Sequence, residues 1–504
     1  MPLRHLALSL LGTREQLTEG DLQRATRLIT LDGICSMAMA SAQGGPFLTA
    51  FALGLGASNY EIGLLAAIGF LSQAVQLPAL FLVRTFPYRR AITVASALSS
   101  RLVWVFIILT PALFVDRGVS WLIHWLFVSA VLTSAAAPAW NSLLRDLVPA
   151  GKLGRVFSLR TLLGNLVALP LTIGGGFFVD WWLAWLPEAS LYAYALLFLA
   201  GLGFGLAGTV AIARLPEPTM RAVQGVRLLE LLAHPLRDRN YRRFLVFVGA
   251  WNFAVNLATP FFAAYMLVRL GLPLSTVTAL TVVAQVANLA FLRLWGRLAD
   301  RFSNKAVIAA CAPFYLLAFV AWAFTGMPDP HWLTLPLLVL IHVVSGMATA
   351  GIGVPIGNIG LKLAPAGSAH AYITLAGLTG AVSGTLGPLL AGVLADFFAA
   401  RQLGLLFTWS EPSREFQFYA LRLEALDFVF LAAVAFGVYA LGRLARVEEE
   451  GQITERSVID EALDEVVLPF RTMSTVEGIR RLTFFPLSTL QRLRPGRPPR
   501  RWPD

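Results

Sequence analysis

Long apolar runs recur along almost the whole 504-residue chain, and they constrain its fold more than any other feature. A helix that crosses a bilayer needs about 20 mostly apolar residues, and the run from Leu191 to Ala213 contains no charged residue. In lipid, every backbone polar group must be hydrogen-bonded within the protein, so spanning segments are helices or closed barrels. Barrel strands alternate apolar and polar residues, and these runs do not. The pattern therefore predicts an all-α membrane protein.

The composition agrees with lipid as the main solvent. Hydrophobic residues make up 57% of the chain and charged residues only 14%, whereas a soluble domain is about a quarter charged. A net charge of +11 would suit a nucleic-acid partner, but the arginines gather in short loops and tails beside the apolar runs. That placement is typical of membrane proteins, so we expect membrane lipid around the chain and no nucleic-acid partner.

Neither a catalytic nor a cofactor site is predicted. Cys35 and Cys311 lie inside apolar runs and are interpreted as small core residues, not as a disulfide or metal ligands. Gly203, Gly205 and Gly208 match a dinucleotide-binding pattern, but that pattern requires a strand and a turn in a soluble unit. Inside an apolar run, close helix packing explains these glycines better. The chain is therefore not expected to be an enzyme.

Twelve spans are predicted in two sets of six. The first set covers residues 28–54, 60–83, 91–115, 119–142, 155–180 and 189–213. The second covers residues 245–269, 275–298, 305–327, 333–361, 369–398 and 424–446. The predicted divisions are an N-terminal six-helix bundle (1–214), a central loop (215–243), a C-terminal six-helix bundle (244–446) and a polar tail (447–504).

Cationic residues are unevenly distributed between the two sides of the predicted membrane. The side that holds both termini also holds the central loop, whereas the opposite side carries few cations, most of them in residues 400–422. Loops rich in Lys and Arg face the cytoplasm. Both termini are therefore predicted to be cytoplasmic, in a multi-pass monomer of a bacterial-type inner membrane.

The two sets of spans repeat one another. Pro46-Phe47 in the first span matches Pro260-Phe261 in the seventh. Asp180-Trp181-Trp182 in the fifth matches Asp396-Phe397-Phe398 in the eleventh, at nearly the same separation along the chain. Two parallel repeats around an axis along the membrane normal are a transporter architecture, with the solute site between the repeats near the midplane.

A charged motif lies between the eighth and ninth spans. It contains Gly296, Asp300, Arg301 and Lys305, and it resembles the loop motif of the major facilitator superfamily. With the twelve spans, the basic central loop and the two like halves, the resemblance covers residues 25–446. It implies the major facilitator fold, a secondary transporter, and a conformational latch at this motif that joins the halves in one state of the cycle.

The motif also has a physical interpretation. Gly296 permits close helix approach, and Asp300 suits a helix N-terminus, whose partial positive charge favours an anion. A solvated turn without a partner is the alternative. In the first half, Phe81 and Thr85 stand where the motif has its glycine and aspartate, so the predicted latch is asymmetric.

The resemblance also implies that the first, fourth, seventh and tenth spans line the solute cavity. Gln43 lies beside a glycine–proline break in the first span, and Asn256 precedes Pro260 in the seventh. A proline removes a helix hydrogen bond, so polar groups near it are predicted to face water. Gln43, Asn256, Trp251 and Tyr265 are therefore predicted to bind the solute, with ordinary packing as the alternative.

Ionisable residues inside the spans are costly in lipid and are functional candidates by default. They are Asp32, Arg101, His124, Arg160, Arg293 and His342. Asp32 and Arg160 both lie one or two turns from the predicted cytoplasmic side, so they are predicted to pair, either as a fixed structural pair or as a proton-coupling site. Arg101 lies near the midplane, where it needs an anion or backbone carbonyls.

Secondary transport is the predicted function. No ATP site is visible, so a proton, another ion or the solute's own gradient would drive it. The sparse charge favours a small neutral or amphipathic solute. The alternative is a non-transporting relative that uses the same fold to bind or assemble a membrane partner, through residues 400–422 and the tail.

Overall fold

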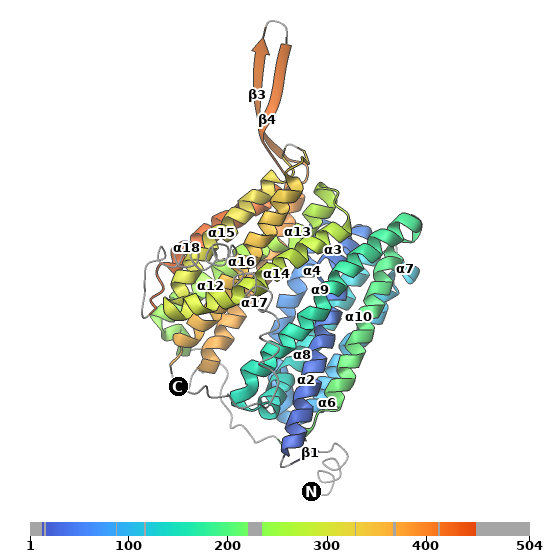
Figure 1. The fold of residues 1–504 in the computed structure, drawn as a ribbon, viewed down its shortest axis with the longest axis vertical. Coiled ribbons are helices and arrows are strands. Elements are labelled where there is room, and N and C mark those ends of the chain that lie inside the picture. The colour runs from blue at the N-terminus through green and yellow to red at the C-terminus, as the bar shows by residue number, and fades with distance from the viewer. Residues whose placement is uncertain are drawn as a thin grey trace, which may run out of the picture.

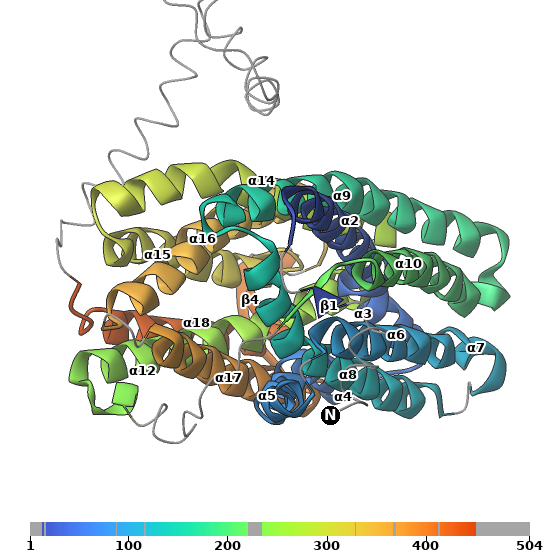
Figure 2. The same cartoon turned by 90° about the horizontal axis from the view of Figure 1, so that it is seen from below.

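The computed structural model describes residues 13–14, 17–86, 88–114, 117–219, 234–327, 329–365, 369–411 and 414–449. Helices α2–α10 and α12–α18 form two groups that lie side by side (Figures 1 and 2). We call these groups the N-terminal half and the C-terminal half. The polar tail and most of the central loop lie outside the described residues, so the predicted divisions of the chain stay predictions.

The N-terminal half begins with a broken first span. Its helices are α2 (Glu19–Gln43), α3 (Gly45–Gly54), α4 (Asn59–Leu71), α5 (Gln76–Thr85), α6 (Arg89–Ile108), α7 (Thr110–Leu113), α8 (Gly118–Leu147), α9 (Leu153–Trp185) and α10 (Ser190–Ala213). A 3-10 turn, η1 (Ser72–Val75), joins α4 to α5. Two short strands, β1 (Thr13–Arg14) and β2 (Glu217–Pro218), pair in parallel beside this half.

The C-terminal half repeats this order. Its elements are α12 (Arg239–Ala258), η5 (Thr259–Phe261), α13 (Phe262–Ala264), η6 (Tyr265–Arg269), α14 (Leu274–Arg301), α15 (Asn304–Phe324), α16 (Thr334–Lys362), α17 (Ala369–Phe398) and α18 (Leu426–Leu444). Within the described residues, eleven helices are long and apolar enough to cross a membrane. The predicted first span is present as α2 and α3 but is not among them, so the predicted count of twelve is not confirmed.

Both predicted mid-span breaks are present, each with a local cause. Gly45 has a φ of +54°, which glycine adopts without a steric penalty, and Pro46 then opens α3. In the seventh span, Pro260 lies in the 3-10 turn η5, and a π-helical turn follows from Tyr265. Because proline cannot donate to the helix ladder, the chain changes helix type at this position.

A β-hairpin replaces the loop expected at residues 400–422. Strands β3 (Gln402–Glu411) and β4 (Arg414–Glu424) pair antiparallel and project from the end of the helices (Figure 1). Leu403, Leu405 and Phe407 alternate along β3, so they share one face, and each is more than half exposed. The segment is therefore an amphipathic ribbon, and this alternation was the signal from which a strand could have been predicted.

We name the two ends of the molecule from these elements. The hairpin face is the end that carries β3 and β4, and the terminal face is the opposite end, where α2 begins and α18 finishes. The ribbons of the two halves meet near the hairpin face and separate toward the terminal face (Figure 1).

Candidate functional site

Two carboxylates join the halves at the hairpin face. Asp180 on α9 accepts hydrogen bonds from the first two backbone N–H groups of α14, at 3.0 and 2.8 Å. Asp396 on α17 accepts them from the first two N–H groups of α4, at 3.2 and 3.0 Å. The N–H groups at a helix start have no partner in the helix, and the dipole there favours an anion. Each half therefore caps a helix of the other.

Glycines let these helices approach each other. A Cβ built at Gly176 would lie 2.9 Å from the Cα of Ser275, and one built at Gly392 would lie 2.7 Å from the Cα of Tyr60. Both distances are too short for a side chain, so glycine is required at each contact. Gly176 and Gly392 occupy equivalent positions in the two halves, as do Asp180 and Asp396, so the predicted repeat produces two equivalent closures of the hairpin face.

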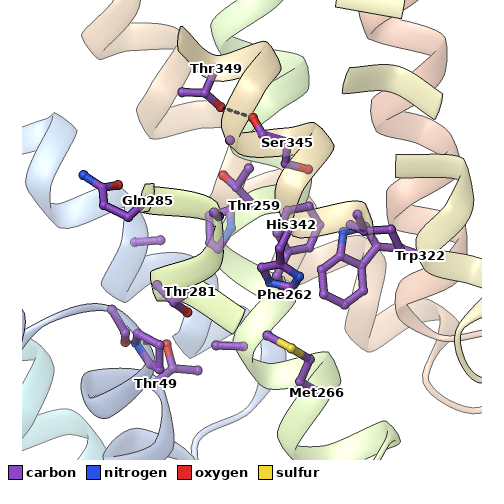
Figure 3. Close-up of a pocket in the computed structure, with 18 of the residues that line it drawn as sticks. Thr49, Thr259, Phe262, Met266, Thr281, Gln285, Trp322, His342, Ser345 and Thr349 are labelled. Carbon is purple, nitrogen blue, oxygen red and sulfur yellow. Dashed lines mark hydrogen bonds between the residues drawn. The ribbon is translucent and has the colours of Figure 1, made fainter. Parts of the chain in front are cut away.

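A first cavity, of about 570 Å³, lies between the halves. Its N-terminal wall comes from α3 and α4, and its C-terminal wall comes from the seventh to tenth spans (Figure 3). The Phe262 ring stacks on Trp322 with centroids 4.4 Å apart, and His342 meets the same indole edge-on at 5.6 Å. We call this space the aromatic cavity.

The aromatic wall contains buried polar atoms that have no hydrogen-bond partner among the described residues. Within the described residues, Trp322 Nε1 and Ser345 Oγ are buried without a hydrogen-bond partner. The Nδ1 of His342 lies 2.7 Å from the carbonyl oxygen of Leu338. Because a carbonyl only accepts, Nδ1 carries the hydrogen, and Nε2 of the neutral ring is an acceptor. A buried polar group without a partner costs about 1–3 kcal/mol, so a solute that pairs with these atoms is favoured.

A second cavity, of about 790 Å³, lies within the N-terminal half and shares Leu48 with the first. Its wall is rich in hydroxyl and amide groups and contains one arginine. These polar residues are Ser36, Gln43, Ser72, Gln73, Gln76, Ser100, Arg101, Ser129, Thr133 and Ser134. We call this space the polar cavity.

Asp32 lies between two arginines beside the polar cavity. Its Oδ2 is 3.3 Å from Nη2 of Arg160, and its Oδ1 is 3.8 Å from Nη2 of Arg101. Ser36 donates to the same carboxylate, and Arg101 also donates to Thr209. The predicted pairing of Asp32 with Arg160 is therefore present, with Arg101 as a second partner. Its coupling role stays a prediction.

Glycines provide the space for this charged cluster. A Cβ at Gly33 would lie 2.1 Å from the Arg160 side chain, and one at Gly208 would lie 3.2 Å from Oδ1 of Asp32. A Cβ at Gly205 would lie 3.3 Å from Arg101. Gly205 and Gly208 thus serve packing, as predicted, and both pack against charged side chains. At Gly203 the prediction is wrong, because no atom lies within 4 Å of a Cβ built there.

Of the four predicted solute-binding residues, Gln43 lines one of the two cavities, whereas Asn256, Trp251 and Tyr265 line neither. Gln43 lines the polar cavity, where its Nε2 donates to the Phe198 carbonyl at 3.0 Å and its buried Oε1 has no partner among the described residues. Asn256 donates to the backbone of its own helix. Trp251 and Tyr265 are buried and line neither cavity. Their rings pack against Tyr315 and Trp322 respectively, and those two residues do line the aromatic cavity.

The predicted latch lies at the terminal face. Asp300 and Arg301 are exposed, and no atom lies within 4 Å of a Cβ built at Gly296, so the close approach expected there is absent in this conformation. The backbone N–H of Lys305 donates to Glu449 at 2.8 Å, within the same half. The closed end of the structure is the hairpin face, so a latch at the terminal face stays a prediction for another state.

Each half also caps its own third span at the terminal face. Glu217 accepts from the N–H of Arg90 at 2.6 Å, and Glu449 accepts from the N–H groups of Asn304 and Lys305. Burial raises the pKa of Glu217 above its ordinary value. Burial also acts to raise the pKa of Glu449, but hydrogen bonds outweigh it and the pKa is lowered. Glu449 therefore remains a charged cap over a wider pH range.

Several residues that line the aromatic cavity were not predicted from the sequence. Trp322, Ser345 and Gln285 line the aromatic cavity without lying beside a proline break. On α14 the polar side chains Thr281, Gln285 and Asn288 recur at helical spacing, and such a stripe in an apolar helix indicates the cavity-facing side. A search for polar stripes would have identified this wall.

Comparisons with known proteins identify the family. Residues 33–388 match the family model of the Major Facilitator Superfamily. Autophagy-related protein 22-2 of Aspergillus oryzae is 29% identical over 182 residues, which covers 33% of this chain and 29% of that protein. The match thus spans less than a third of that relative's length.

Solved transporter structures share the fold. A mutant of the nucleoside transporter NupG superposes with a TM-score of 0.65 at 13% identity, over 84% of this chain and 100% of that one. A D-xylose–proton symporter gives a TM-score of 0.60 at 14% identity, over 86% and 98% of the two chains. These identities support the fold alone, but the family model covers most of the chain. The chain belongs to the major facilitator superfamily.

Proposed function

We propose that this chain is a secondary transporter that moves a small amphipathic solute across a membrane by alternating access. The observation that carries the proposal is the pair of adjoining cavities between and within the halves, beneath a hairpin face closed by Asp180 and Asp396. In this proposal the aromatic cavity holds the apolar part of the solute, and the polar cavity holds its polar part.

The conformational change must exchange one set of contacts for another. Opening the hairpin face removes the four backbone hydrogen bonds to Asp180 and Asp396, and a hydrogen bond to a charged group contributes roughly 1.5–3 kcal/mol. The state open at the hairpin face therefore needs compensating contacts at the terminal face. We propose that the latch around Asp300 supplies them.

Proton coupling is proposed for Asp32. Its carboxylate contacts Arg160 on α9 and Arg101 on α6, so a rearrangement of these helices changes the charge around it. We further propose that the terminal face is cytoplasmic, in a bacterial-type inner membrane, as the arginine distribution predicts. We also propose that the protein acts as a monomer.

A reversible cross-link tests alternating access. The Nδ2 of Asn59 lies 2.9 Å from Oδ1 of Asp396 across the interface, so Asn59→Cys/Asp396→Cys, in a background without Cys35 and Cys311, places two thiols close together. Solute flux into proteoliposomes should stop on oxidation and return on reduction. Equal flux in both states, with the cross-link verified on a gel, would overturn alternating access at this interface.

The exposed ribbon favours one alternative function, the binding of a membrane partner without transport. Leu403, Phe407 and Trp409 present apolar surface at the hairpin face, which favours a non-transporting relative that binds a membrane partner. Replacing residues 402–424 by a short Gly-Ser linker separates the two functions. A transporter keeps its flux without the ribbon, whereas a binding protein shows no flux with or without it.

A further inference from the structure

We infer that the transported solute carries one acidic group, which binds Arg101 in the polar cavity. This inference rests on the proposed transport function and names the class of its substrate. The acidic group is a carboxylate or a phosphate, since both present oxygens that match the guanidinium fork.

The first argument is the charge of the cluster. Two arginines face one aspartate, which gives the three side chains a formal charge of +1. Asp32 comes from α2, Arg101 from α6 and Arg160 from α9, and the nearby residues of α10 are Gly205, Gly208 and Thr209. Among the described residues that line the polar cavity, Arg101 is the one charged side chain. An unbalanced cation inside a membrane requires an anion, and a solute can supply it.

The second argument is the geometry of the two arginines. The contact of Asp32 with Arg160 is 3.3 Å, within hydrogen-bond range for this donor and acceptor. Its contact with Arg101 is 3.8 Å, an ion pair that is too long for a hydrogen bond. Asp32 is thus committed mainly to Arg160, which lies outside the lining of the polar cavity. Arg101 lines that cavity and has donors to spare, since a guanidinium carries five N–H groups.

The third argument is the remaining wall. Ser100, Ser129 and Thr133 form a hydroxyl cluster with oxygens 2.7 to 3.0 Å apart, next to Arg101 in the lining. Gln43 offers a buried Oε1 without a partner among the described residues. An acid oxygen on Arg101 and a neighbouring O–H or N–H of the same solute on Gln43 satisfy both groups. The adjoining aromatic cavity, with Trp322 in its wall, receives an apolar or aromatic remainder.

Matched phenyl compounds test the inference without knowledge of the natural solute. Phenylacetate and phenyl phosphate carry an acid, and phenylacetamide is the uncharged counterpart of the first. Each is added at millimolar concentration to the purified full-length protein, and the shift in Tm is measured, since a compound that binds only the folded form stabilises it. We expect at least one acid to raise Tm more than the amide, and the larger acid shift identifies the carboxylate or the phosphate.

Three variants assign the effect to Arg101. The acid preference should disappear in Arg101→Gln and persist in Arg145→Gln, which removes the same charge from an exposed arginine outside the cavity. Arg101→Lys keeps the charge and should retain a smaller preference, so it answers the question even where the Gln variant does not fold. Equal shifts from acid and amide, no shift from either acid, or loss of the preference in Arg145→Gln alone would each overturn the inference.

Flux measurements separate this inference from the proposed function. If proteoliposomes transport phenylacetamide but neither acid, the proposed transport function is supported and the acidic class of substrate is ruled out. If the acids raise Tm in a way that depends on Arg101 but no tested compound is transported, the acid-binding site is supported and the proposed transport function is contradicted.

Discussion

The two halves of the molecule repeat their backbone contacts but present different chemistry to the cavities. At the hairpin face, Asp180 and Asp396 make the same cap in each half. The charged cluster is not repeated, because the alignment of the halves places Leu316 opposite Arg101 and Val246 opposite Asp32. In the proposed mechanism, the repeated residues serve the movement of the halves, whereas the unrepeated residues give the site its selectivity.

The aromatic wall is also asymmetric, but here it is the C-terminal half that carries the distinctive residues. In the same alignment, Trp322 and Phe262 of the C-terminal half occupy the positions that Ile107 and Leu48 hold in the N-terminal half. In the proposed transporter, the N-terminal half recognises charge and hydrogen-bonding groups, and the C-terminal half recognises flat apolar groups. A solute that uses both halves is amphipathic, and it is held in a fixed direction across the interface.

The largest expected effect comes from removing the acid of the charged cluster. Asp32→Val installs on α2 the residue found at the equivalent position of the C-terminal half, Val246. It leaves Arg101 and Arg160 without their carboxylate partner. Breaking a buried ion pair from one side typically costs about 3–5 kcal/mol, so we expect a large fall in Tm and poor yield. Thermal unfolding of the purified protein measures it.

A triple variant is the matched control. Asp32→Val, Arg101→Leu and Arg160→Ala together install the C-terminal counterparts at all three positions. Since replacing a whole buried ion cluster by apolar residues is often neutral or stabilising, most of the lost Tm should return while the acid preference stays absent. A triple variant as unstable as Asp32→Val would contradict this account of the cluster.

A smaller effect is expected from filling the space beside Arg160. In Gly33→Ala the new methyl group collides with the Arg160 side chain, and forcing extra volume into a packed site typically costs about 1–3 kcal/mol. Gly203→Ala, on α10, meets no atom within 4 Å. It should raise helix stability slightly, since alanine is the better helix former. Tm values that fall equally in both variants would rule out the steric explanation.

The paired caps should respond alike. Asp180→Asn and Asp396→Asn each keep the shape and remove the charge at a helix start, a contribution of about 0.3–1 kcal/mol. Each should increase the time for which the hairpin face is open, by a similar factor. Labelling of a cysteine placed at Thr278, beside the Gly176 contact, measures this opening, and strongly unequal rates would show that the repeat does not extend to function.

The smallest effect on stability is expected at the terminal face. Asp300 is exposed in this conformation, so Asp300→Asn should leave Tm unchanged. It should nevertheless slow transport, because the charge is needed when the latch forms. Flux equal to that of the parent protein, at equal expression, would count against the latch.

The sequence predicted those features that follow from local chemistry. The breaks at Gly45 and Pro260 could be read directly, because glycine and proline fix backbone conformation without help from neighbours. The pairing of Asp32 with Arg160 followed from the cost of isolated charge in lipid. Each of these predictions rested on a strong, short-range preference.

The side of a helix that faces the cavity was harder to predict. Trp251 and Tyr265 were predicted to bind the solute because they lie near a proline break. Instead, Trp322 on another helix packs against Tyr265 and lines the cavity in its place. Unlike α14 with its polar stripe, the span that carries Trp322 is apolar all round, so periodicity does not show which of its faces meets lipid and which meets the cavity. That information lies in the packing of distant helices, and only the structure supplies it.

The double cap at the hairpin face also bears on ion leakage. The α9–α14 and α17–α4 contacts lie at opposite edges of the interface (Figure 2), so neither cap covers the edge that the other one seals. Because a breach at either edge opens the cavities toward the hairpin side, the fraction of time with an open path is about the sum of the two separate fractions. If the chain is the carrier proposed above, both caps must therefore hold at the same time for a membrane under voltage to keep its ion gradients.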